Sequence, residues 1–386
     1  MTRRVSRRAF VGGLTCALGC AHGRPTEHSG DGSALALARG LAARFVHRHS
    51  PQRVPWRWDG AIAMLGLARV ATATGQTTGP VATFVADYFR HHDGTPRIVM
   101  PDHCAPALAA AAARDLIGDA AARRAVAPVA EFLRTQPRNR LGALDHLGHG
   151  TALAALYPKS IWIDSLMMYA LPAALAGAWL PDPALADFGH RQPALFARAL
   201  QDPYTGLFRH AYLYERGRAR PRAPVFWLRG NGWVACALVD MLQHRRDARN
   251  LALLQTLAAA LLEHQRADGS WTTVLDDSQT YVESSGTALV GYALAKGARL
   301  GLIPATAHDA GVRAMDALRA RLRSKRDGLS LAGISGPTIP SSRAGYASVP
   351  RRSDIDYGVG AFLMLAVELS NQNSMHPMTK SCDYPK

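Results

Sequence analysis

The feature that most constrains the fold is a helical hydrophobic period that recurs along nearly the whole chain. Apolar residues return every three to four positions, and no run of alternating β-branched residues competes with this pattern. The segments with this period are 33–48, 59–73, 80–91, 103–117, 119–134, 163–178, 184–200, 230–245, 249–265, 284–300, 305–323 and 356–371. The sequence therefore predicts an all-α protein.

The helical segments alternate between two types. In 249–265, the residues Leu254, Leu257 and Leu261 form one apolar stripe, which is typical of a helix with one exposed face. In 284–300 and 356–371, glycine, alanine and apolar residues surround the helix. A helix that is apolar on nearly all sides is buried on nearly all sides. We therefore expect pairs in which an outer helix covers an inner one.

Six such pairs favour an (α/α)6 barrel, a single closed domain over residues 33–371. A length of 386 residues alone would suggest two or three domains. However, the internal similarity is too weak for an open solenoid, and neither end carries a polar capping repeat. Four long stretches separate the helices, at 135–162, 201–229, 266–283 and 324–355. Loops of this length often carry function, and we expect them to gather at one mouth of the barrel.

The charge balance indicates the class of partner. The chain has 45 basic and 29 acidic residues, which gives a net charge of +16 and favours anionic partners. The sequence has neither zinc-ligand spacing nor a basic patch interleaved with aromatic residues, so nucleic acid is not an expected partner. Its histidines and five cysteines follow no recognised ligand pattern. We therefore predict no metal and no cofactor.

The N-terminus predicts export. Arg7-Arg8 precedes an uncharged stretch over residues 9–21, and together they resemble a twin-arginine export signal. The stretch is too short to span a bilayer. Cys20 follows Ala17-Leu18-Gly19 and resembles the lipidated cysteine of a lipoprotein, while ordinary cleavage after Ala21 is the open alternative. The mature protein is expected in the periplasm or anchored to a membrane through Cys20, with 372–386 as a C-terminal tail.

The most specific string in the chain is Trp-Leu-Arg-Gly-Asn-Gly-Trp at 227–233. It resembles the signature of the unsaturated rhamnogalacturonyl hydrolases, glycoside hydrolase family 105. In the related family 88, the unsaturated glucuronyl hydrolases, Gln-Ala more often replaces Asn-Gly. The stretches 161–168, 205–210, 268–271 and 357–363 also agree with the first family. The resemblance covers about residues 55–370, and it implies an (α/α)6 barrel that needs no metal or cofactor.

The resemblance implies hydration of the double bond in a Δ4,5-unsaturated uronic acid, the sugar that polysaccharide lyases leave at a non-reducing end. Protonation of this enol ether at C4 creates positive charge at C5, which water attacks, and a positioned carboxyl group can assist both steps. Asp164 matches the family's catalytic aspartate, and Asp102 matches its second acidic position. A helix cap is the alternative role of both. We expect burial beside Trp162 and the nearby Asp102 to raise the pKa of Asp164.

The resemblance also implies residues that bind the substrate. His210 matches a substrate-side histidine of the family. Arg229 and Asn231 lie where a loop enters a helix, a position that favours anions, so we expect Arg229 to bind the substrate carboxylate. Trp233 is a candidate platform for stacking a sugar. His146 is a further candidate, although extra residues over 142–158 depart from the family pattern, leave this match open and predict an altered rim of the pocket.

Three functions remain open at this stage. The first is release of the unsaturated uronic acid from pectic, rhamnogalacturonan-type oligosaccharides. The second is the family 88 activity on fragments of the glycosaminoglycan type, which Asn231-Gly232 disfavours. The third is a barrel that binds acidic oligosaccharides without catalysis. The sequence indicates no oligomeric state.

Overall fold

The computed structural model describes residues 30–93 and 96–371. The predicted export signal, including Cys20, and the predicted tail at 372–386 lie outside the described residues. The inner helices are α2 (Trp58–Ala73), α4 (Pro106–Ala112), α8 (Leu171–Trp179), α10 (Leu228–His244), α12 (Ser284–Arg299) and α15 (Asp356–Ser370). The outer helices are α1 (Gly30–Arg48), α3 (Pro80–His91), α6 (Asp119–Thr135), α9 (Pro183–Leu200), α11 (Ala248–Glu263) and α13 (Ala307–Arg319), and α5 (Arg114–Ile117) links α4 to α6.

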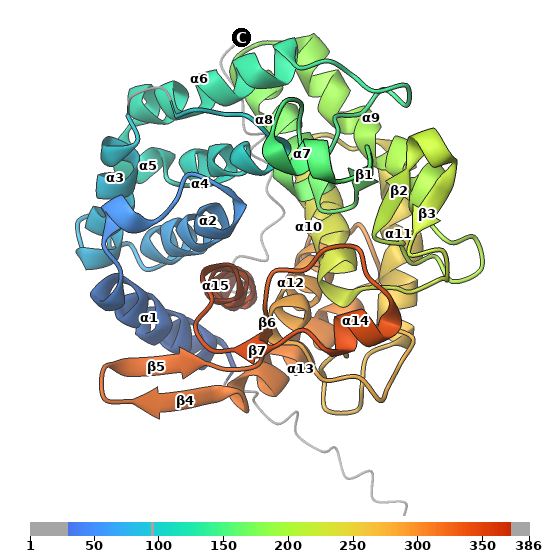
Figure 1. Ribbon diagram of the computed structural model, residues 1–386. Helices are drawn as coiled ribbons and strands as arrows, with labels where there is room; N and C mark the ends of the chain where they lie inside the picture. Colours follow the sequence, from blue (N-terminus) through green and yellow to red (C-terminus); the bar gives the residue numbers. More distant parts are fainter. Residues whose placement is uncertain (1–29, 94–95, 372–386) are drawn as a thin grey trace, which may run out of the picture.

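The inner helices form a closed ring. Each contacts the next in chain order, and α15 packs against α2 to close the circle. Figure 1 looks down the axis of the barrel, with α2 and α15 side by side in the ring and the outer helices around it. The predicted (α/α)6 barrel is confirmed. Among the described helices, none is long and apolar enough to cross a membrane.

The small residues of the inner helices explain how the ring closes. A Cβ atom at Gly66 of α2 would lie 2.7 Å from the carbonyl oxygen of Gly360 in α15, so the two backbones touch where only glycine fits. The outer helices instead bury one stripe. In α11 the predicted stripe of Leu254, Leu257 and Leu261 is buried. These two patterns are the inner and outer types that the sequence distinguishes.

The long connections contain short strands that the sequence analysis does not predict. β1 (Ile161–Trp162), β2 (Ala211–Leu213) and β3 (Arg218–Arg220) form an antiparallel sheet in that order, and β6 (Ile334–Ser335) pairs with β7 (Arg351–Arg352). Helix α13 ends at Arg319, short of the predicted 323, because β4 (Leu322–Lys325) and β5 (Gly328–Leu331) form a hairpin there. Strands of two to four residues are too short to show a period of two.

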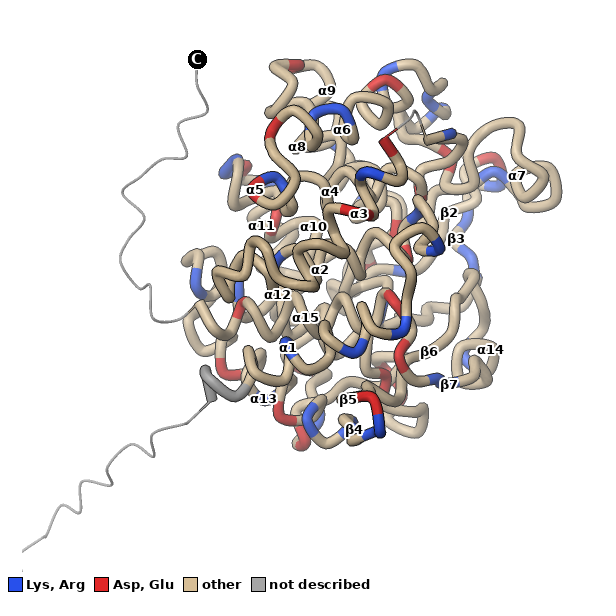
Figure 2. The backbone as a smooth tube through the Cα atoms, turned by 90° about the vertical axis from the view of Figure 1, so that its left-hand side faces the viewer, with Lys and Arg blue, Asp and Glu red and all other residues tan. Residues whose placement is uncertain are grey.

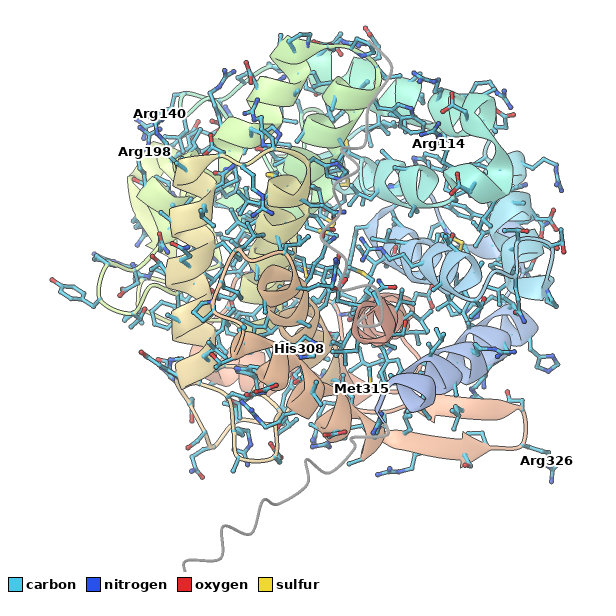
Figure 3. The ribbon with its side chains drawn as sticks, turned by 180° about the vertical axis from the view of Figure 1, so that it is seen from behind. Arg114, Arg140, Arg198, His308, Met315 and Arg326 are labelled. Atoms are coloured by element: carbon cyan, nitrogen blue, oxygen red, sulfur yellow. The ribbon has the colours of Figure 1, made fainter. Side chains whose placement is uncertain are left out.

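Most of these connections lie at one end of the barrel. Figure 2 shows α7 (Ala152–Leu156), β2, β3, β6, β7 and α14 (Arg343–Ala347) together on one side, beside the first residues of the inner helices. The hairpin β4–β5 lies apart from them and packs against α1. Exposed arginines lie on the periphery, and Figure 3 shows Arg326, between β4 and β5, pointing away from the barrel. We call the end that carries these connections the loop mouth.

Candidate active site

The two predicted aspartates lie at the loop mouth, each just before an inner helix. Asp102 belongs to the 3-10 turn η2 (Pro101–His103) that leads into α4, and its side chain is 19% exposed. Asp164 follows β1 and precedes the π-helical turn η3 (Leu166–Ala170) that leads into α8, and its side chain is 15% exposed. The N-cap positions of these turns are Met100 and Ser165. Neither aspartate is therefore held there as a cap.

A buried histidine faces Asp164. The Nε2 atom of His210 lies 3.1 Å from Oδ2 of Asp164. The backbone places it there, since Ile163 N–H donates a hydrogen bond to the His210 carbonyl oxygen next to the β1–β2 pairing. On its other side, His210 Nδ1 lies 2.8 Å from the hydroxyl of Tyr346. The imidazole also stacks on Trp227, with ring centres 4.4 Å apart.

Tyr346 fixes the orientation of this histidine. Its hydroxyl oxygen accepts the Ser341 N–H at 3.1 Å and lies 2.8 Å from His210 Nδ1, to which a hydroxyl can donate or from which it can accept. With Nδ1 held against Tyr346, the Nε2 atom of His210 faces Asp164. Tyr346 is buried and stacks in parallel with Trp227. The sequence analysis does not identify Tyr346, which is separated from the 227–233 string by more than 100 residues and carries no motif of its own.

His146 lies on the other side of the aspartates. Its Nδ1 atom is 2.9 Å from the hydroxyl of Ser165, its Nε2 atom is 3.9 Å from Oδ1 of Asp102, and its ring stacks on Trp162 at 4.2 Å. Burial lowers the pKa of His146 to about 4, despite the opposing charge of Asp164. The structure thus places His146 in the site as a neutral imidazole, although the extra residues over 142–158 left its match open.

The pKa values of the two aspartates are shifted in opposite directions. Burial raises the pKa of Asp102 to about 8, and the carboxylate of Asp164 adds to the increase. Burial would also raise the pKa of Asp164, but the charge and the contact of His210 outweigh it and lower that pKa. The expectation of a raised pKa at Asp164 is therefore wrong. At neutral pH the pair holds one proton, which rests on Asp102.

Arg229 does not lie where the sequence analysis expects it. Its side chain is 1% exposed, and its Nη1 and Nη2 atoms donate to the carbonyl oxygens of Ser335 and Gly336, each at 2.9 Å. The guanidinium lies against the rings of Trp227 and Tyr357, 4.8 Å from each ring centre. The prediction that it binds the substrate carboxylate is corrected: its donors hold the loop after β6 against the barrel.

The side chains of Asn231 and Trp233 are also buried next to the site. Asn231 is fully buried: its Oδ1 atom accepts the Phe208 N–H at 2.8 Å, and its Nδ2 atom donates to the carbonyl oxygens of Phe208 and Trp227. It thereby fixes the turn that carries His210. Trp233 is buried and makes a T-shaped, edge-to-face contact with Trp58, with ring planes at 84°. Neither side chain is placed to contact a sugar directly, which corrects both predictions.

An exposed cation, Arg57, lies at the loop mouth instead. It precedes α2, its side chain is 54% exposed, and its Nε and Nη2 atoms donate to Asp59 at 2.9 and 2.8 Å. Its positive charge acts on Asp102, where it opposes the rise in pKa. The first turns of all six inner helices face this mouth, and helix N-termini favour anions. This end of the barrel therefore suits an acidic ligand.

No metal site accompanies these groups in the described part of the chain. Among residues 30–93 and 96–371, no set of three or more His, Cys, Asp or Glu side chains is arranged to hold a metal ion.

Comparison with known proteins supplies the relatives of this chain. The family model described as Glycosyl Hydrolase Family 88 matches residues 39–372. The unsaturated rhamnogalacturonyl hydrolase YesR of Bacillus subtilis is 26% identical over 338 residues, covering 84% of this chain and 93% of that protein. An unsaturated 3S-rhamnoglycuronyl hydrolase of Alteromonas is 30% identical over 149 residues, 37% of this chain and 36% of that protein.

A solved structure shares the fold. A protein of Klebsiella pneumoniae, described as a possible member of glycoside hydrolase family 105, superposes with a TM-score of 0.79 at 23% identity. The match covers 91% of this chain and 96% of that one. The barrel is thus an architecture already known in solved structures.

Proposed function

The chain belongs to glycosyl hydrolase family 88, and from this premise we propose that it releases a Δ4,5-unsaturated uronic acid from the non-reducing end of pectic, rhamnogalacturonan-type oligosaccharides. Hydrolysis of unsaturated uronyl sugars is the activity that the family relatives support, and the protein is a glycoside hydrolase. The pectic substrate is supported by the long alignment with YesR, which covers 93% of a protein named for rhamnogalacturonyl hydrolysis.

The observation that carries the proposal is the pair of aspartates with opposite pKa shifts. A pair in which one carboxyl keeps its proton and the other stays ionised is the arrangement that acid–base catalysis requires. Asp102, with a pKa of about 8, holds a proton at neutral pH, and Asp164 beside His210 is ionised. Both side chains retain access to solvent and hence to a substrate.

The proposed reaction begins with proton transfer from Asp102 to C4 of the unsaturated sugar. The electron pair of the C4–C5 double bond forms the new C–H bond, and positive charge develops at C5 and the ring oxygen. Water then attacks C5 while Asp164 takes up its proton. The resulting hemiketal opens to a ketone at C5, and the hemiacetal formed at C1 releases the rest of the oligosaccharide as an alcohol. One water molecule is consumed in all.

Two neighbours prepare the aspartates for these steps. His210 stabilises the ionised form of Asp164 through the 3.1 Å contact. Arg57, exposed beside Asp102, is the proposed partner of the substrate carboxylate in place of Arg229, because a guanidinium fork suits a carboxylate. Trp162 and Trp227, which stack on His146 and His210, keep both imidazoles in fixed orientations.

The substrate is tested with fragments from pectic lyase digestion and, separately, from glycosaminoglycan lyase digestion. The unsaturated sugar absorbs in the ultraviolet, and hydration removes this absorbance. Loss with pectic fragments supports the proposal. Loss with only the glycosaminoglycan fragments assigns the second activity considered above, and binding of either fragment without loss of absorbance assigns a barrel that binds but does not react.

Export of the protein is a separate proposal that rests on the sequence of residues 1–21 alone. Replacing Arg7 and Arg8 with lysine should leave the precursor in the cytoplasm, as seen by cell fractionation. Cys20→Ser distinguishes the two cleavage routes. If the mature Cys20→Ser protein still partitions with membranes, the lipid anchor is excluded.

A further inference from the structure

A cavity lies at the end of the barrel opposite the loop mouth, among the last turns of the inner helices. Its volume is about 450 Å³, within the range of small-molecule sites. Arg69 of α2 lines it, ten residues after Asp59 at the loop mouth. At 1.5 Å per residue this is about 15 Å along the helix. The cavity is therefore separate from the aspartate pair, and nothing in the proposed reaction uses it.

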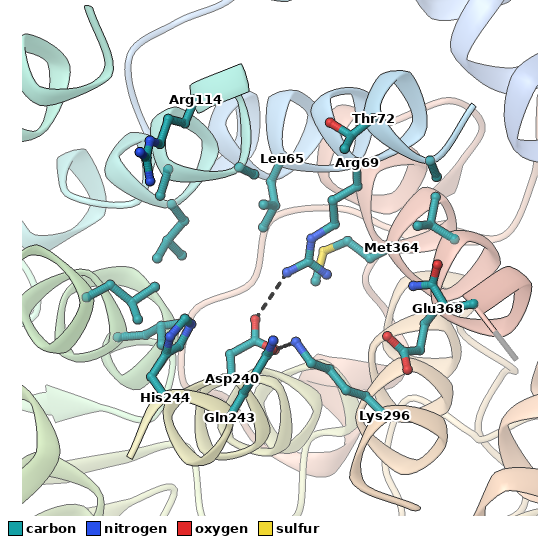
Figure 4. Close-up of a pocket in the computed structure, with 18 of the residues that line it drawn as sticks. Leu65, Arg69, Thr72, Arg114, Asp240, Gln243, His244, Lys296, Met364 and Glu368 are labelled. Carbon is teal, nitrogen blue, oxygen red and sulfur yellow. Dashed lines mark hydrogen bonds and ion pairs between the residues drawn. The ribbon is translucent and has the colours of Figure 1, made fainter. Parts of the chain in front are cut away.

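Charged side chains converge in this cavity, as Figure 4 shows. Lys296 Nζ lies 2.6 Å from Asp240 Oδ1, and Arg69 Nη2 lies 3.3 Å from Asp240 Oδ2. Tyr292 donates its hydroxyl to the same carboxylate at 2.7 Å. Burial would raise the pKa of Asp240, but Lys296 and Arg69 outweigh it and lower that pKa to about 2, so Asp240 remains ionised.

The charges around the cavity do not balance. Arg69, Lys296 and Arg299 line the cavity, and Asp240 and Glu368 are the carboxylates that they contact, so basic side chains outnumber acidic ones by one. Burial lowers the pKa of Lys296, and the charge of Asp240 opposes this decrease. Arg114 also lines the cavity, but it pairs with Asp119 at 2.8 Å. The C-terminal ends of helices favour cations, which explains why basic residues stand in these last turns. It does not explain why they surround an open space.

Arg69 has N–H groups that remain available to a ligand. Arg69 donates to Asp240 at 3.3 Å and its guanidinium lies over the Tyr292 ring, 5.0 Å from the ring centre. Its side chain lines the cavity and is 22% exposed, so part of its five N–H groups can reach a ligand. Neutral polar groups complete the wall, among them Thr72, Gln243 and His244, whose pKa is lowered by burial. An anion held by Arg69 would contact these groups through its hydroxyls.

We propose that this cavity is a second ligand site, which binds a small hydroxylated oxyanion such as a sugar acid, with its charged group on Arg69 and Lys296. The uncompensated cation supplies the attraction, and the guanidinium fork suits the two oxygens of a carboxylate or phosphate. The cavity is large enough for a single sugar unit. The site does not depend on the proposed reaction.

Isothermal titration calorimetry tests the site with three probes: galacturonate, inorganic phosphate and neutral galactose. Two variants are compared with the wild-type protein. Arg69→Gln removes the cation, and Ala111→Leu fills part of the cavity while leaving every charge in place. We expect galacturonate to bind the wild-type protein, galactose not to bind, and both variants to bind galacturonate at least tenfold more weakly. Activity at the loop mouth should stay within twofold in Ala111→Leu.

The probes also identify the chemistry of the anion. Phosphate binding that the variants weaken equally assigns the site to oxyanions in general, and galacturonate binding alone assigns it to sugar acids. If Arg69→Gln does not fold, Ala111→Leu decides. The proposal is overturned if neither anion binds the wild-type protein saturably, if galactose binds as well as galacturonate, or if binding is unchanged in Ala111→Leu, because the anion then occupies another site.

Discussion

Replacing Asp102 with asparagine should abolish turnover and, at the same time, make the protein more stable. The pKa of Asp102 rises from 3.8 in the unfolded chain to about 8 in the folded protein. The folded state therefore binds more protons between these two pH values. The stability of the wild-type protein is highest below pH 3.8 with respect to this group, falls as pH rises, and reaches its lowest level above pH 8.

The magnitude follows from the two pKa values. At pH 7 the unfolded carboxyl is ionised about 3 pH units above its pKa, and each unit corresponds to about 1.4 kcal/mol, so keeping Asp102 in place costs at most about 4 kcal/mol. Because 19% of the side chain is exposed and water relieves part of this cost, we expect about half. Asparagine has nearly the same shape and no charge. Asp102→Asn should therefore gain about 2 kcal/mol at pH 7.

The assay is urea unfolding at several pH values, combined with the ultraviolet assay for activity. Between pH 5 and pH 8 the gain in the Asp102→Asn protein should grow with pH. Asp59→Asn is the matched control, because Asp59 is also 19% exposed and lies at the same mouth but is paired with Arg57. The charge of Asp59 contributes less to the raised pKa of Asp102 than burial does, so the gain in Asp59→Asn should be much smaller than that in Asp102→Asn. If Asp102→Asn is as stable as the wild-type protein or less stable across this range, the raised pKa of Asp102 and the assignment of the shared proton to Asp102 are refuted.

Other substitutions test the remaining assignments. Tyr346→Phe removes the hydroxyl that orients His210, so kcat should fall about tenfold with little change in KM, and the acid limb of the kcat–pH profile should shift. If the acid limb of that profile does not shift, the role of Tyr346 is only structural. Arg229→Lys loses the fork that holds two carbonyl oxygens, so the free energy of unfolding should fall by about 2 kcal/mol, and a protein of wild-type stability would contradict the loop-holding role. Arg57→Gln should raise KM at least tenfold and leave kcat within threefold, and an unchanged KM would remove Arg57 from the carboxylate site.

Most of the fold can be predicted from the sequence, because the helical hydrophobic period is a local feature that repeats along the chain. The Gly- and Ala-rich segments become the inner ring, and Gly66 against Gly360 shows the close approach that this composition permits. The strands could not be predicted, because β1 and β6 have two residues each and exist only through pairing with distant segments. The predicted end of α13 is wrong for the same reason, because the β4–β5 hairpin begins there.

The sequence indicates candidate side chains of the site, but it does not show how these side chains are arranged. The motif at 227–233 lies next to the candidate site, but the side chains of Arg229 and Asn231 are buried there and donate to backbone carbonyl groups. A sequence shows that an arginine is present but not which groups its donors meet. Likewise, the direction of the pKa shift at Asp164 depends on His210, whose position is set by strand pairing.

The most direct test is the ultraviolet absorbance of a purified unsaturated pectic disaccharide incubated with the protein at pH 7. The wild-type protein should remove the absorbance with release of the second sugar, and Asp164→Asn should do so at least a hundredfold more slowly while remaining folded, in line with general acid–base contributions of about 10² to 10⁴. No loss of absorbance with the wild-type protein, or equal loss with a folded Asp164→Asn protein, would contradict hydration by the Asp102–Asp164 pair.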